Sequence, residues 1–145
     1  MDETFYINRG ISERKLKKYD FAVLAFTKAI EINPNCAEAY YNRGISFNGL
    51  KRYGQAIADF NKALELNSNN DFRMGVYVNR EKSYAELKQY ELAIQDCNKI
   101  IELNPNFHVG YLYRSECYRA LGNNAKAEAD YKKYEELLEL HLLRR

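Results

Sequence analysis

Apolar positions along this chain recur at the spacing of one helix face, not at the alternation of a strand. In the segment 40–50, the residues that share a face are Tyr40, Arg43, Gly44, Phe47 and Leu50. The segment 56–64 repeats the same spacing after a break of only a few residues. Because so short a connection forces two helices to run antiparallel, the sequence predicts a helical hairpin here.

The same hairpin pattern occurs four times. A tyrosine marks each copy, at Tyr6, Tyr40, Tyr77 and Tyr111, with separations of 34, 37 and 34 residues. A leucine follows each of these tyrosines by ten residues, and an alanine follows it by sixteen. Twenty residues after each tyrosine stands a mostly aromatic column, consisting of Phe26, Phe60, Cys97 and Tyr131. Self-similarity at a fixed period indicates an array of stacked repeats.

These columns resemble the tetratricopeptide repeat, whose pattern runs aromatic, Leu-Gly, Tyr, Ala, Phe and Pro at fixed offsets. The second copy supplies Tyr40, Gly44, Phe47, Ala56 and Phe60. The resemblance implies an all-α fold, a right-handed solenoid of four antiparallel helix pairs with a C-terminal capping or extended helix. It implies a single domain over residues 1–145, with repeats at 3–36, 37–70, 74–107 and 108–141. Three extra residues, 71–73, predict either a longer loop or an extra helical turn before the third repeat.

Arginine replaces the usual leucine of the family at Arg9, Arg43, Arg80 and Arg114. An aspartate follows three of these arginines by sixteen residues, at Asp59, Asp96 and Asp130. We therefore expect structural ion pairs between the two helices of a repeat, because a half-buried guanidinium needs a carboxylate partner. The first repeat has Ala25 at that position. A stripe of arginines that binds phosphate is the alternative.

The resemblance implies that the first helix of each repeat lines a concave groove for a peptide. Asn8, Asn42 and Asn79 occupy one column there, with Tyr113 in the fourth repeat. An amide side chain offers hydrogen-bond donors and an acceptor to any peptide backbone. The alternative is that these asparagines only solvate an exposed helix face. The expected peptide-binding residues are Ile7, Asn8, Ile11, Arg14, Tyr41, Asn42, Ile45, Val78, Asn79, Lys82, Leu112 and Tyr113.

We therefore expect a protein-interaction scaffold or adaptor that binds an extended peptide or a helix of a partner protein. Family members that grip the acidic tail of heat-shock chaperones use cationic groove residues, which this chain lacks at the matching positions. The C-terminal helix is rich in leucine, and either caps the fourth repeat, docks on another copy as a homo-oligomer, or meets a further repeat.

Charge and chemistry exclude other classes. The 22 Lys and Arg against 20 Asp and Glu leave a net charge of +2, too little for an RNA-binding helical repeat, so we expect no nucleic acid. There is no glycine-rich phosphate loop, catalytic carboxylate pair or activated nucleophile, so we expect no enzyme, cofactor or metal. Neither a basic leader nor an apolar run of eighteen residues is present. The three cysteines are odd in number and widely spaced, which is typical of free thiols in a reducing compartment. The expected location is cytoplasmic, with no membrane contact.

Overall fold

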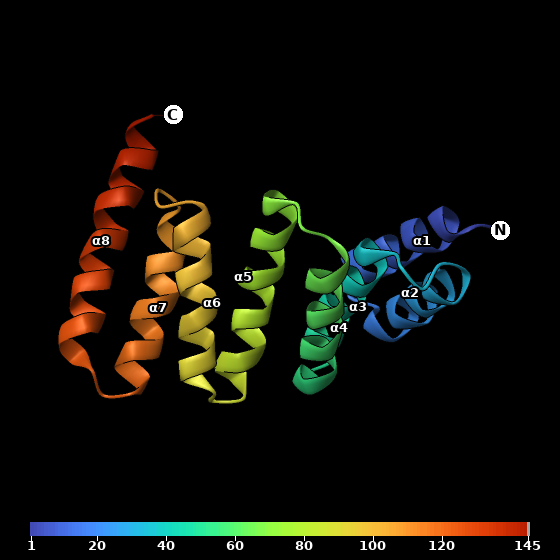
Figure 1. Ribbon diagram of the computed structural model, residues 1–145, viewed down its shortest axis with the longest axis horizontal. Coiled ribbons are helices and arrows are strands. Elements are labelled where there is room, and N and C mark those ends of the chain that lie inside the picture. Colours follow the sequence, from blue (N-terminus) through green and yellow to red (C-terminus); the bar gives the residue numbers. More distant parts are fainter. Residues whose placement is uncertain (145) are drawn as a thin grey trace. The chain divides into compact units, whose positions relative to one another are not determined.

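The regular structure of this chain is entirely helical in the computed structural model, which describes residues 1–144 (Figure 1). Each predicted hairpin is a pair of consecutive helices. The pairs are α1 (Glu3–Lys15) with α2 (Tyr19–Ile32), α3 (Ala37–Gly49) with α4 (Tyr53–Leu66), α5 (Asn70–Glu86) with α6 (Tyr90–Leu103), and α7 (His108–Ala120) with α8 (Asn124–Leu143). None of these helices combines the length and the apolar character needed to cross a bilayer.

The three extra residues before the third repeat form an additional helical turn. Helix α5 has 17 residues, whereas α1, α3 and α7 have 13 each. Asn69 starts this turn, because its side chain accepts a hydrogen bond from the backbone N–H of Phe72 at 3.0 Å. Of the two sequence-based alternatives, the structure therefore selects the extended helix.

The turn inside each pair ends the first helix with one left-handed residue. This residue is Lys17, Lys51 or Lys88, each with φ of 60°, and Gly122 with φ of 80° in the last pair. At the second turn the backbone N–H of Arg52 donates to the carbonyl of Phe47 at 2.8 Å, which closes the end of α3. Three of the four turns thus place a lysine in a conformation that favours glycine.

Two of the three connections between pairs contain an Asn-Pro-Asn sequence, at residues 33–35 and 104–106. The Asn33 side chain accepts from the backbone N–H of Asn35 at 3.1 Å, and Asn104 does the same for Asn106 at 3.2 Å. The first tyrosine of the following repeat adds a second tie, since the Tyr40 hydroxyl donates to the carbonyl of Pro34 at 3.1 Å. The Tyr111 hydroxyl donates in the same way to the carbonyl of Pro105 at 3.2 Å, so two members of the tyrosine column anchor the preceding loop.

The helices form two compact units, Met1–Asn79 and Arg80–Arg145, and the division falls within α5. In the first unit the core is made of alanines and phenylalanines on the facing helices. Gly10 and Gly44 leave room for rings: a Cβ at these positions would lie 2.5 Å from the Phe26 ring and 2.6 Å from the Phe60 ring. In the second unit α7 packs against both α6 and α8, over a core that includes Ala93, Cys97, Ile100, Cys117 and Ala127.

Candidate functional site

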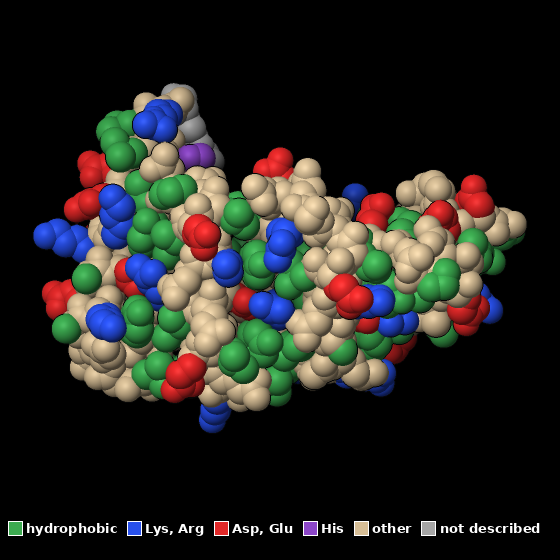
Figure 2. Space-filling view, in the orientation of Figure 1, with side chains coloured by type: hydrophobic (Ala, Val, Ile, Leu, Met, Phe, Trp, Pro, Cys, Tyr) green, Lys and Arg blue, Asp and Glu red, His purple; other side chains and the backbone are tan. Residues whose placement is uncertain are grey.

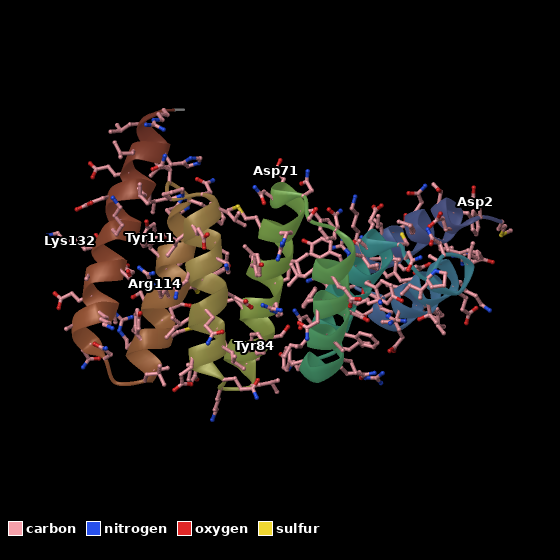
Figure 3. All side chains as sticks on the ribbon, in the orientation of Figure 1. Asp2, Asp71, Tyr84, Tyr111, Arg114 and Lys132 are labelled. Atoms are coloured by element: carbon pink, nitrogen blue, oxygen red, sulfur yellow. The ribbon has the colours of Figure 1, made fainter. Side chains whose placement is uncertain are left out.

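The arginine column forms structural ion pairs, as predicted from its spacing to aspartate. Arg43 donates from Nε and Nη2 to the two carboxylate oxygens of Asp59, both at 2.8 Å. Arg80 binds Asp96 through the same two atoms at 3.0 and 2.6 Å, and Arg114 binds Asp130 at 2.7 Å twice. Figure 3 shows Arg114 on α7, one turn from Tyr111.

The remaining faces of these guanidinium groups are also occupied. Arg43 Nη1 donates to the hydroxyl of Thr27 on the helix before it, at 3.2 Å, and its Cζ lies 5.6 Å from the centre of the Tyr40 ring. The hydrogen bonds that Arg43 donates to Asp59 raise the pKa of Arg43, while burial raises the pKa of Asp59 against the effect of Arg43. These contacts favour a structural role over a phosphate-binding stripe, because the donors are already used.

The first repeat lacks this ion pair, as the presence of Ala25 predicted. The Arg9 side chain is 63% exposed, and its Nε lies 3.9 Å from Glu13 on its own helix. An exposed pair of this kind contributes little to stability. Arg9 is therefore the member of the column whose charge is open to solvent.

The expected groove residues differ in accessibility. Asn8 and Lys82 are exposed, whereas Ile7 belongs to the core and Asn42 is only 6% exposed. The others are half-buried, namely Ile11, Arg14, Tyr41, Ile45, Val78, Asn79, Leu112 and Tyr113. Ile7 packs in the core of the first unit, and Asn42 is buried on α3. A helical spacing alone does not reveal this burial.

Two asparagines of the groove column bind their own helix. The Nδ2 group of Asn42 donates to the carbonyl of Glu38 at 2.9 Å, and Nδ2 of Asn79 donates to the carbonyl of Gly75 at 2.9 Å. Nδ2 of Asn79 also donates to the Tyr41 hydroxyl at 3.1 Å. A backbone-gripping role for this column therefore has to rest on Asn8 and on the groups around Tyr41.

Within residues 1–79, three first helices bring polar groups together at Tyr41. We call Arg14 of α1, Tyr41 of α3 and Asn79 of α5 the Tyr41 cluster. Burial raises the pKa of Tyr41, and the charge of Arg14 and the hydrogen bond from Asn79 oppose that rise. The Nε atom of Arg14 is buried and has no hydrogen-bond partner. A buried guanidinium N–H without an acceptor is costly, so the cluster is suited to receive an oxygen atom.

One buried acidic residue escaped the sequence reasoning. Glu81 of α5 is 5% exposed and accepts a hydrogen bond from the Cys117 thiol of α7, with 3.6 Å between Sγ and Oε1. Burial raises its pKa to about 7. The signal was present in the sequence, because Glu81 occupies the column that holds glycine at Gly10 and Gly44.

The two histidines look isolated along the chain, but the structure brings them together. The rings of His108 and His141 lie 5.6 Å apart between centres, and Tyr134 lies 5.8 Å from His108. No group of three or more His, Cys, Asp or Glu side chains among residues 1–144 could hold a metal ion. The histidine pair is therefore part of the contact between α7 and α8.

The C-terminal helix α8 packs on α7 through Ala127, Asp130 and Leu137. Its last turns still expose apolar side chains, those of Leu140, Leu142 and Leu143. Helix α8 is therefore the second helix of the last pair, and its final turns present further leucines to solvent.

Comparisons with known proteins agree with this architecture. The sequence model of the tetratricopeptide repeat family matches residues 4–36 and 37–70, and a second model of the same description matches residues 76–107. A search of curated protein sequences finds no significant match.

Solved structures with the same fold include the crystal structure of MamA, with a TM-score of 0.90. It is 21% identical, and the match covers 97% of this chain and 80% of that chain. MamA 41-end from Desulfovibrio magneticus RS-1 is also 21% identical and has a TM-score of 0.88, over 95% of this chain and 76% of that one. The first TPR of Spaghetti (RPAP3), bound to the HSP90 peptide SRMEEVD, is 26% identical with a TM-score of 0.77, over 83% of this chain and 94% of that one.

Proposed function

Because this chain belongs to the tetratricopeptide repeat family, we propose that it is a protein-interaction scaffold that binds an extended peptide or a helix of a partner protein. In the unit Met1–Asn79, the peptide lies on the face formed by the first helices, with the Tyr41 cluster as its polar anchor. Asn8, Ile11 and Ile45 on these helices add an exposed amide and two half-buried aliphatic side chains. In the unit Arg80–Arg145, the proposed contact residues are Lys82 on α5 and Leu112 and Tyr113 on α7.

The observation that carries this proposal is the buried, unpartnered Nε of Arg14 beside Tyr41 and Asn79. A bound peptide that draws the half-buried Arg14 side chain outward would give this N–H a backbone carbonyl or a carboxylate as its acceptor. Such a bond to a charged donor is stronger than one between neutral groups. The anchor is independent of the ligand's side chains, which suits a scaffold for extended segments.

A peptide partner is also supported by the structure of the first TPR of Spaghetti (RPAP3), which is bound to an HSP90 peptide. The same acidic tail is not the ligand we propose here. The positions matching the chaperone clamp hold Ile7, Ile11, Asn42, Gly75 and Asn79 or, one repeat later, Tyr41, Ile45, Asn79, Val109 and Tyr113. No cation among them would answer a terminal carboxylate, and Asn42 is buried.

The surface charge fits a protein partner better than a nucleic acid. Figure 2 shows Lys and Arg interspersed with Asp and Glu on the face it presents, without a continuous basic area. A nucleic-acid-binding array needs a basic stripe along its groove. We therefore propose no nucleic-acid ligand.

Affinity capture from the source lysate tests the proposal. The bait is the whole chain, compared with a variant that carries Asn8→Ala and Arg14→Ala and with the matched control Lys99→Ala on the second helix α6. The groove variant should lose captured proteins that the wild type and the control retain, with circular dichroism unchanged. An identical set of captured proteins from all three baits would contradict the proposal.

A second candidate function rests on the exposed leucines of α8. Leu142 and Leu143 are 55% and 75% exposed, and apolar side chains gathered on one helix end suit self-association. Light scattering over a concentration range would show dimers that Leu142→Glu removes. A monomer at every concentration would eliminate this candidate.

A further inference from the structure

The third repeat replaces a packing pair that two other repeats share. In the first two repeats, a glycine on the first helix faces a phenylalanine ring on the second, as Gly10 with Phe26 and Gly44 with Phe60. In the third repeat the same two columns hold Glu81 and Cys97. In the third repeat, the thiol of Cys97 stands in place of a phenylalanine ring. The side chain of Glu81 stands in place of the hydrogen atom of a glycine. The two changes match in volume, and together they put an acid in the core.

No Lys, Arg or His among residues 1–144 forms an ion pair with Glu81. The Glu81 carboxylate accepts a hydrogen bond from the weak donor Cys117. The neighbouring charges Glu116 and Asp96 are of the same sign. A buried carboxylate without a positive partner lowers stability, so its presence calls for a ligand.

The Glu81 side chain lines a surface pocket of about 390 Å³ between α5, α6 and α7. The charged residues around this pocket are Glu81, Glu86, Glu116 and Lys88. Tyr90 and Cys117 provide less polar wall. Three carboxylates against one ammonium group give the pocket a negative character. Its size suits an amino-acid side chain.

We propose that this pocket binds the basic side chain, lysine or arginine, of a bound peptide, and that the Glu81 carboxylate is its ion-pair partner. The inference deepens the proposed function and rests on it, since it names the chemistry of one side chain in the partner. The apolar stem of a lysine or arginine would contact Tyr90 and Cys117 while its charged head reaches Glu81. In the free protein, burial of the Glu81 carboxylate is unfavourable. A bound cation offsets this unfavourable free energy, and the offset contributes to the affinity.

Binding should strengthen as pH rises. Glu81 has a pKa of about 7 and is partly protonated at neutral pH, and a cation binds its ionised form. The titratable groups facing it are Cys117, Glu116 and Tyr113 on α7 and Asp96 and Cys97 on α6, with Glu86, Lys88 and Tyr90 lining the pocket. The hydrogen bond with Cys117 and burial raise the pKa of Cys97, so this thiol stays protonated. Raising the pH from 6 to 8 should therefore tighten binding several-fold through Glu81.

Nuclear magnetic resonance titration of the whole chain tests this inference with three probes. The probes are the N-acetyl methylamides of lysine, arginine and norleucine, and norleucine serves as the uncharged control of matched length. Amide signals of Glu81, Cys117 and Ala120 should shift with at least one cationic probe and saturate at millimolar concentration. The norleucine probe should leave them in place. Equal shifts with norleucine, or none with either cation, would overturn the inference.

Two variants make the test specific. Glu81→Gln should weaken the cationic probe about tenfold or more, whereas Glu91→Gln, an exposed glutamate elsewhere on α6, should leave its affinity unchanged. The double variant Glu81→Gly with Cys97→Phe restores the pair of the other repeats, so it should fold and lose binding. Unchanged affinity in Glu81→Gln would refute the ion pair.

Failure of this inference is distinguishable from failure of the proposed function. If no probe binds but the groove variant still loses captured proteins, the Glu81 pocket is refuted and the scaffold proposal stands. If a cationic probe binds through Glu81 while capture is unaffected by the groove variant, the peptide face is misplaced and the pocket stands.

Discussion

Arg114 and Asp130 form a two-pronged ion pair in which both N–H···O distances are 2.7 Å. Its counterparts are Arg43 with Asp59 and Arg80 with Asp96, so one interaction joins the two helices of three repeats. Asp59 is 5% exposed, and removal of Arg43 would leave it buried without a cation. The pairs therefore hold the hairpins in register.

Arg43→Ala should lower the free energy of unfolding by about 2–4 kcal/mol, because it strands the Asp59 carboxylate. Urea unfolding followed by circular dichroism measures this change. Arg9→Ala is the matched control and should cost less than about 0.5 kcal/mol, since Arg9 pairs only with an exposed neighbour. Partner capture by Arg43→Ala should equal that of the wild type. Unchanged stability with lost capture would assign Arg43 to binding instead.

Lys51→Gly should stabilise the chain by about 0.5–1 kcal/mol. Lys51 has φ of 60°, a backbone conformation that is strained for a residue with a Cβ but not for glycine. Glycine also makes the unfolded chain more flexible, which offsets part of the stability gained by removing the strain. Thermal unfolding would register this as a rise in Tm. Lys51→Ala keeps the Cβ and should give no comparable rise in Tm. Equal effects of the two variants would contradict backbone strain at Lys51 as the cause.

The stability contributed by Glu81 should depend on pH in the opposite sense to that of an ion-paired acid. Its pKa rises from 4.5 to about 7 on folding, so the folded state holds more protons than the unfolded state between these values. The contribution is fully favourable below about pH 4.5 and is lost as pH rises through 7. Glu81→Gln should therefore exceed the wild type in stability at pH 8, by up to roughly 3 kcal/mol, and lose this advantage near pH 5.

Unfolding curves at pH 5 and pH 8 for both proteins give the comparison. Glu91→Gln corrects for the general loss of one negative charge. A stability difference between Glu81→Gln and the wild type that is independent of pH would mean that Glu81 ionises normally in the folded chain.

Periodic features of the fold could be predicted from the sequence because each copy repeats the same local physics. The spacing of sixteen residues between Arg43 and Asp59 was enough to predict their pairing, since it places them on facing helices. The three residues before the third repeat fitted either a loop or a helix. The choice depends on the Asn69 cap, which only the coordinates show.

The candidate site was less predictable because it depends on where single side chains point. Asn42 and Asn79 suit a peptide by type, but their amide N–H groups bond to carbonyls four residues earlier in their own helices. The electrostatic interaction between Arg14 and Tyr41 joins two helices, and no local sequence pattern indicates it. Glu81 is the exception, because comparing the glycine column between repeats would have found it.

The most direct test of the scaffold proposal is photocrosslinking from the face of the first helices. A benzoylphenylalanine replaces Asn8 on α1, or Glu65 on α4 as the control, and both positions are exposed. Crosslinked adducts in the source lysate are identified by mass spectrometry. We expect a partner protein to crosslink from Asn8 and not from Glu65, and Arg14→Ala to reduce its yield. Equal adducts from both positions, or adducts from Glu65 alone, would contradict the proposed binding face.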